Sequence, residues 1–265
     1  MSISAPTLTA TRPAAGTRPG ARLIQPVYLR TELRRLLRNR RSVIISLIMP
    51  PGLFLLFGTA SAYRTQSAGA GNVTAYVMIS MALYGTLLAT TSGGASVSVE
   101  RAQGWSRQLR LTSLRPGVYV VTKVIVAMVA GLASMAVTVL VGWWSGAQLG
   151  LVRLVACVLI AWVGSSVFAA FGLFMGYLLP SENVMQILGP ALAVLAFAGG
   201  LFMPLNGGVF ATVAHFMPTY GLAELTRGPL VGSAPSVWAY VNVVVWGVVF
   251  AAGAAWRFRR DTARV

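Results

Sequence analysis

Side chains that could carry out acid–base or metal chemistry are few and scattered along this chain. They comprise one cysteine, one histidine and five carboxylates, namely Cys157, His215, Glu32, Glu100, Glu182, Glu224 and Asp261. No two carboxylates share a helical face inside an apolar segment, so catalysis by a carboxylate pair has no candidate. A metal site needs several His, Asp or Glu residues in one region. We therefore expect no active site, no metal site and no cofactor bound by this chain.

Three of these groups, and the only lysine, have simple interpretations. Cys157 lies in an apolar run with no disulfide partner, so we interpret it as a small packed hydrophobic residue. His215 and Glu224 are nine positions apart and could meet only through folding; we interpret them as an interfacial histidine and a capped or paired glutamate. Lys123 lies in the sequence VTKVIV, so the chain has no GxxxxGK[ST] loop and cannot bind ATP through one.

The composition indicates a membrane protein. Of 265 residues, 56% are hydrophobic and only 10% are charged, with a mean hydropathy of +0.73, whereas a soluble domain carries roughly 25% charged residues. Basic residues outnumber acidic ones by 21 to 5, which on a soluble chain would suggest nucleic acid binding. Here they lie in termini and loops, where they set membrane topology, so we expect a lipid membrane and no nucleic acid as partner.

Six apolar segments predict six transmembrane helices, because about 20 apolar residues cross a bilayer. They lie near residues 43–62, 74–97, 118–144, 152–179, 185–203 and 236–256. Eighteen basic residues fall on one side of these spans, so the positive-inside rule places both termini and residues 98–117 in the cytoplasm. The predominance of arginine over lysine suggests a bacterial source, and hence the bacterial cell membrane. No predicted span has a charge near its centre, which argues against ion coupling.

The remaining segments complete an all-α integral membrane fold with a transmembrane domain over residues 43–258. Residues 1–25 and 259–265 are expected to be cytoplasmic tails, the first disordered. Leucines spaced along residues 26–42 among arginines predict an interfacial amphipathic helix; the alternative is a solvated basic run. Four prolines in moderately apolar residues 204–235 predict short helices that re-enter the outer leaflet before the last span.

Two motifs resemble those of a known family. The first is Glu100-Arg101-x-x-Gly104-Trp105, followed by Leu109, Thr112, Leu114 and Pro116; the second reads GGLFMPL over residues 199–205 and HFMPTY over residues 215–220. With six spans and the amphipathic helix in the same order, residues 26–258 resemble the type 2 ATP-binding-cassette exporter permeases. Trp105 stands where that family usually has a small or hydroxyl residue.

The resemblance implies a half-transporter without an ATPase site of its own. Two permeases, identical or paralogous, would pair with two ATPase subunits that bind ATP and Mg. Residues 98–117 would form the coupling helix seated on the ATPase, and the turn at 180–183 a second contact. The residues we expect to couple the chain to the ATPase are Glu100, Arg101, Gly104, Trp105, Arg110 and Glu182.

The resemblance also places the translocation path between the two permeases, along the first, second and fifth spans. Candidate lining side chains are aromatic residues and methionines, which adapt to apolar ligands but also serve as plain packing. They are Phe54, Phe57, Met81, Tyr84, Met185, Phe197 and Phe202. We expect export of an amphipathic small molecule, such as a drug or antibiotic, or of a lipid. The alternatives are a polysaccharide or peptide exporter, or a scaffold that does not transport.

Overall fold

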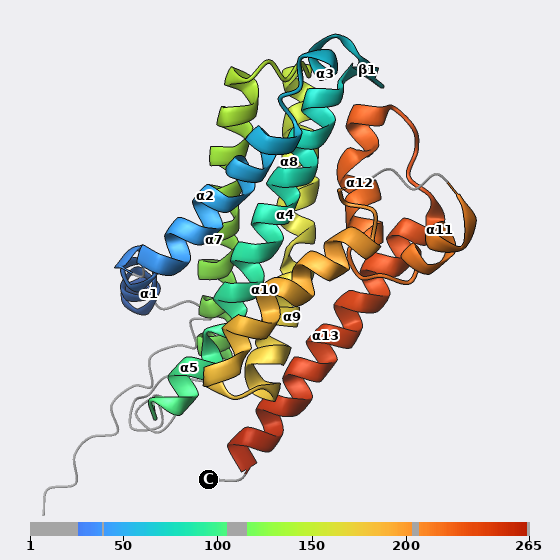
Figure 1. The fold of residues 1–265 in the computed structure, drawn as a ribbon. Coiled ribbons are helices and arrows are strands. Elements are labelled where there is room, and N and C mark those ends of the chain that lie inside the picture. The colour runs from blue at the N-terminus through green and yellow to red at the C-terminus, as the bar shows by residue number, and fades with distance from the viewer. Residues whose placement is uncertain (1–25, 39, 105–115, 203–206, 264–265) are drawn as a thin grey trace, which may run out of the picture.

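The computed structural model describes residues 26–38, 40–104, 116–202 and 207–263, which are almost entirely helical (Figure 1). The predicted tail over residues 1–25 and the coupling residues Trp105 and Arg110 lie outside this part of the chain. The elements are α1 (Pro26–Arg38), α2 (Arg40–Phe57), α3 (Ser61–Thr65), β1 (Ser67–Ala68), β2 (Gly71–Asn72), α4 (Val73–Ala95), α5 (Val97–Ala102), α7 (Pro116–Trp144), α8 (Leu151–Gly164), α9 (Ser166–Leu178), α10 (Ser181–Ala198), α11 (Gly208–Ala214), α12 (Tyr220–Val231) and α13 (Val237–Ala263).

Five helical segments in the described residues are long and apolar enough to cross a membrane, which confirms the all-α membrane fold. They are Val73–Ala102, Gly117–Trp144, Leu151–Leu178, Ser181–Ala198 and Val237–Arg260, and they correspond to the second to sixth predicted spans. The first predicted span, 43–62, contains only the shorter apolar helix Ile44–Phe57. About 20 residues are needed to cross a bilayer, so a sixth crossing stays a prediction.

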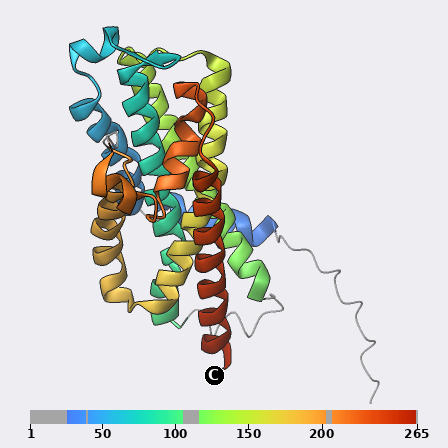
Figure 2. The ribbon, with the colours of Figure 1, turned by 90° about the vertical axis from the view of Figure 1, so that its right-hand side faces the viewer.

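Helix α4 is the centre of the bundle, with α2, α7, α9, α10 and α12 packed around it (Figures 1 and 2). The span that includes α4 is 78% buried inside the chain, whereas the span of α13 is 17% buried. A helix whose residues are apolar all round and buried has no face left for lipid. The outer helices therefore supply most of the surface available to the membrane.

Glycines let α9 approach α4 at backbone contact distance. A Cβ atom added at Gly172 would lie 2.1 Å from the carbonyl oxygen of Thr91, and one at Gly94 would lie 2.4 Å from that of Ala169. Gly176 faces Ala95 one turn further along, at 3.0 Å. Small residues four positions apart allow such close packing in membrane helices, and the Gly172-x-x-x-Gly176 run of the sequence makes it here.

Asn72 organises the end of the bundle that carries the β1–β2 hairpin. Its amide nitrogen donates to the carbonyl oxygens of Arg64, at 3.1 Å, and Gly146, at 2.9 Å. Its side-chain oxygen accepts from the backbone N–H of Ala75, capping α4, and from that of Gln148. All four hydrogen bonds of one buried amide thus join the hairpin, α3, α4 and the α7–α8 connection.

Two short helices, α11 and α12, lie between α10 and α13, as the prolines of this region predict. Helix α12 begins about halfway along the bundle and rises to the hairpin, where Ala70 donates to the carbonyl oxygen of Leu230 at 2.8 Å (Figure 1). Asn242 of α13 holds its start, since its side chain donates to the carbonyls of His215 and Met217 and accepts from the N–H of Gly221. Entry of these helices into a membrane stays a prediction.

Gly172→Ala should destabilise the protein, because the added methyl group meets backbone that cannot rotate away. We expect a loss of about 1–3 kcal/mol from overpacking, measured as a lower midpoint of thermal unfolding in detergent micelles. The matched control is Gly247→Ala in α13, where the added atom makes an ordinary contact of 3.5 Å with Val167. Equal midpoints for the two variants would contradict close α4–α9 packing.

Candidate functional site

The predicted coupling residues Glu100 and Arg101 lie on α5, a short helix that continues α4 beyond Ser96. Figure 1 shows α5 at the end of the bundle opposite the hairpin, near the start of α10. Gly104 follows α5 with a φ of +71°, and a Cβ there would meet nothing within 4 Å. This φ lies in the left-handed region of backbone conformation, which favours glycine.

Glu100 is the centre of a buried ion cluster that joins α1, α5 and α7. Its side chain is 4% exposed, and one carboxylate oxygen contacts both the ammonium of Lys123 and the guanidinium of Arg35, the latter at 2.9 Å. The other oxygen accepts from the Tyr119 hydroxyl at 2.5 Å. Lys123 in turn contacts Glu32 of α1 at 2.5 Å.

We call the residues Glu32, Arg35, Glu100, Tyr119 and Lys123 the inner ion cluster. It holds two carboxylates and two cations, so its formal charge is zero. Three of its four charged side chains are at most 5% exposed, and only that of Arg35, at 44%, reaches solvent. Breaking a buried ion pair by removing one partner leaves a charge without compensation. The ion pairs between carboxylates and cations of α1, α5 and α7 therefore hold these three helices in one arrangement.

Arg101 ties α5 to a fourth helix. Its guanidinium donates to the carbonyl oxygens of Tyr177, at 3.1 Å, and Gly176, at 3.4 Å, and lies 5.6 Å from the centre of the Tyr177 ring. A cation at these carbonyls neutralises the negative end of the α9 dipole. Glu182, the predicted second coupling residue, is exposed in the first turn of α10, next in sequence to α9.

The candidate path residues divide into buried and exposed groups. Phe54, Met81 and Tyr84 are at most 3% exposed and belong to the hydrophobic core, as their alternative role of plain packing predicts. Phe202 is partly buried and packs edge-on against Tyr84, with ring centres 5.0 Å apart. Two residues are exposed, namely Phe57 at 61% and Phe197 at 50%. Nothing is described of the Met185 side chain, and a path along these residues stays a prediction.

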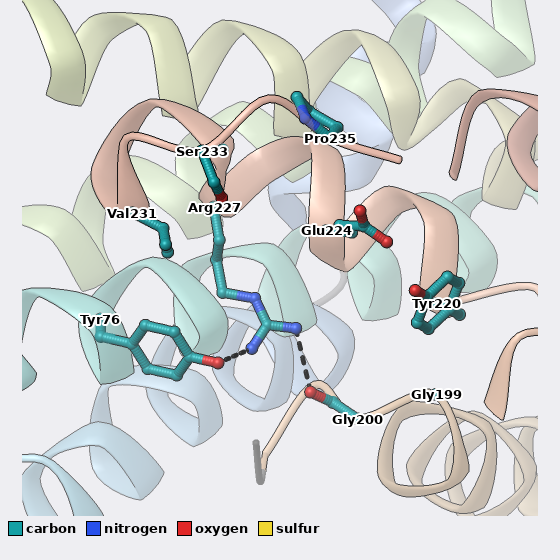
Figure 3. A pocket seen from close by; sticks show the side chains of 10 residues that line it. Tyr76, Gly199, Gly200, Tyr220, Glu224, Arg227, Val231, Ser233 and Pro235 are labelled. Atoms are coloured by element: carbon teal, nitrogen blue, oxygen red, sulfur yellow. Dashed lines mark hydrogen bonds between the residues drawn. The ribbon is translucent and has the colours of Figure 1, made fainter. Parts of the chain in front are cut away.

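A cavity of about 260 Å³ lies beside α12, the short helix that reaches the hairpin; Figure 3 shows its lining side chains. It is formed by α4, by the end of α10, by α12 and by the connection to α13. Its lining residues are Tyr76, Gly199, Gly200, Tyr220, Glu224, Arg227, Gly228, Val231, Ser233 and Pro235. We call it the outer cavity.

Arg227 and Glu224 bring opposite charges to the outer cavity. Arg227 donates to the carbonyl oxygens of Gly200 and Ala223, each at 3.0 Å, and to the Tyr76 hydroxyl (Figure 3). Glu224 accepts from the backbone N–H of Ser236 at 2.6 Å, immediately before the start of α13. Burial opposes its ionisation, but hydrogen bonds from Tyr220 and Ser236 outweigh burial and lower the pKa of Glu224 below its ordinary value.

Sequence reasoning did not bring either group of charges together. Lys123 lies in the third predicted span and Glu32 in the predicted amphipathic helix, with 91 positions between them. The available signal was chemical, since Lys123 is the only lysine of the chain and Glu32 the only carboxylate of α1. No role was predicted for Arg227, although its surroundings supply aromatic and carbonyl partners.

This fold, with five helical segments long and apolar enough to cross a membrane, defines a multi-pass helical membrane protein. The chain belongs to the ABC-2 type transporter family, whose model matches residues 27–231, and the resemblance carried by the two motifs is confirmed. It is similar to "Putative transport permease YvfS" of Bacillus subtilis (strain 168), with 26% identity over 212 residues that cover 74% of this chain and 83% of that protein. Membership of the family implies an ATP-binding-cassette ATPase as partner.

Lys123→Met should destabilise the protein strongly, because it leaves Glu32 and Glu100 with only the half-exposed Arg35 as counter-charge. Removing one partner from a buried pair costs about 3–5 kcal/mol, and we expect a matching fall in the thermal unfolding midpoint in detergent. Exposed Arg153, replaced by glutamine, is the control and should leave the midpoint unchanged.

The double variant Lys123→Met with Glu32→Gln restores a neutral cluster of Glu100 and Arg35. It should recover at least half of the lost stability. A double variant less stable than Lys123→Met alone would show that the Lys123–Glu32 pair is not the source of the effect.

Proposed function

We propose that this chain is the transmembrane subunit of an ATP-driven exporter. In this proposal two permeases, identical or paralogous, assemble with two ATPase subunits that bind ATP and Mg. The ATPase docks on residues 98–117 from the cytoplasm of a bacterial cell, where both termini also lie. The exported molecule is an amphipathic small molecule, such as a drug or antibiotic, or a lipid.

The observation that carries the proposal is the attachment of the coupling segment to the rest of the bundle. Glu100 joins α5 to α1 and α7 through the inner ion cluster, and Arg101 joins it to α9. A force applied to α5 by an ATPase would therefore act on four helices at once. Closely packed elements move as units rather than deforming continuously, which is what a coupling segment requires.

The arrangement of α2, α4 and α10 supports a path between two permeases. Both α2 and α10 lie on the same face of α4 (Figures 1 and 2), and each presents an exposed aromatic residue, Phe57 and Phe197. A second permease placed against this face would enclose apolar aromatic surface, which suits an amphipathic molecule better than an ion. Helix α10 would thereby serve both the path and, through Glu182 in its first turn, the contact with the ATPase.

The direct test of the assembly is affinity purification of the full chain from its native membranes in mild detergent. We expect an ATPase with a P-loop at about one copy per permease, and a second permease of the same or a different sequence identified by mass spectrometry. Recovery of the chain with no ATPase would overturn the proposed export function and favour the alternative of a membrane scaffold that does not transport.

Arg101→Ala should uncouple ATP hydrolysis from transport, because α5 loses its attachment to the end of α9. In vesicles containing the purified complex, efflux of a fluorescent amphipathic dye or phospholipid should fall at least tenfold while the ATPase still co-purifies and hydrolyses ATP. Arg153→Gln is again the control. Export unchanged by Arg101→Ala, and also by Glu100→Gln, would contradict the coupling role of this segment.

A further inference from the structure

The outer cavity contains two opposite charges that do not pair with one another. Each is hydrogen-bonded to neutral groups: Arg227 to two backbone carbonyls and the Tyr76 hydroxyl, Glu224 to the hydroxyl and N–H of Ser236. Among the described residues, neither Arg227 nor Glu224 has an oppositely charged group within 4.0 Å.

The guanidinium of Arg227 has more N–H groups than it has hydrogen bonds to the described residues. It carries five N–H groups, of which three are used, one on Nε and one on each terminal nitrogen. Each terminal nitrogen therefore keeps one further N–H, and the pair suits the two oxygens of a phosphate or carboxylate. The same guanidinium stacks over the Tyr76 ring at 4.9 Å, which holds its plane in position.

Glu224 makes the cavity unsuitable for a simple anion. Its carboxylate lines the same 260 Å³ space and would repel a ligand that carried only negative charge. A ligand with both an oxyanion and an ammonium group would instead neutralise Arg227 and Glu224 together. Such a zwitterion compensates both of these partly buried charges, whereas either ion alone compensates one and opposes the other.

Aromatic residues beside the cavity indicate its depth in the membrane. Tyr76 and Tyr220 are part of its lining, and Trp238 and Tyr240, shortly after the lining residue Pro235, are 70% and 54% exposed. Tyrosine and tryptophan concentrate where lipid headgroups meet the hydrocarbon region. A ligand at this level has its polar end in the cavity and its apolar part among lipid chains.

We propose that the outer cavity binds the zwitterionic polar end of an amphipathic molecule, with its oxyanion on Arg227 and its ammonium on Glu224. The rim residues Val231 and Ser233 are exposed, so the cavity is open to such a molecule from the surface. The inference extends the proposed export function by naming a class of ligand. It rests on that function only for the direction of transport, because binding itself needs no ATPase.

The test titrates the purified permease in detergent, without ATPase, with short-chain phosphatidylethanolamine and, in parallel, with short-chain phosphatidylglycerol. We expect tighter binding of phosphatidylethanolamine, and at least tenfold weaker binding of it by Arg227→Gln. Glu224→Gln should reduce the preference for phosphatidylethanolamine over phosphatidylglycerol, a change that simple loss of structure would not produce. Arg153→Gln is the control for a basic residue on the same predicted side of the membrane.

Ser233→Phe is a second test in case a charge variant fails to fold. It narrows the opening of the outer cavity and leaves Arg227 and Glu224 unchanged. It should weaken binding while the unfolding midpoint stays unchanged. A further titration uses free phosphoethanolamine. If it binds as tightly as the lipid, the site is supported and its ligand is a soluble zwitterion rather than a lipid. Equal affinity for the two lipids, or binding unaffected by Arg227→Gln and Ser233→Phe, would overturn the inference, even if export itself is established.

Discussion

The inner ion cluster is the interaction on which the end of the bundle opposite the hairpin depends. An ammonium group in an apolar bundle is costly unless it is paired and hydrogen-bonded, and Lys123 meets this condition only if Glu32 and Glu100 both reach it. Those carboxylates come from helices on either side of the long α2–α4 segment. One buried cation therefore determines where α1 and α5 lie relative to α7.

The packing around α4 determines which helices a displacement of α5 would move. Backbone contact at Gly94 and Gly172 leaves α4 and α9 no room to slide past one another, and interiors packed in this way transmit strain rather than absorb it. Helix α5 continues α4, and Arg101 holds it to the end of α9. A displacement of α5 must therefore move this pair of helices together.

The sequence predicted the elements of this fold better than the contacts between them. Apolar length located five spans, and leucine spacing located α1, because both signals are local and periodic. The first predicted span, 43–62, is longer than the helix that the structure shows, since α2 contains Pro50 and Pro51 and its apolar part ends at Phe57. The pairing of Glu32 with Lys123 joins residues 91 positions apart. No periodicity encodes such a pair, although the rarity of both residue types marks them as unusual.

The two ends of the bundle treat buried charge in different ways, and the difference has a physical consequence. At the inner end each charge meets its opposite within the chain, so the structure is complete without a ligand. In the outer cavity the hydrogen bonds of Arg227 and Glu224 are made with neutral groups, which compensate a charge less fully than a direct ion pair does. A site of the first kind is suited to holding helices in place. A site of the second kind retains electrostatic free energy that a ligand of matching charges can release on binding.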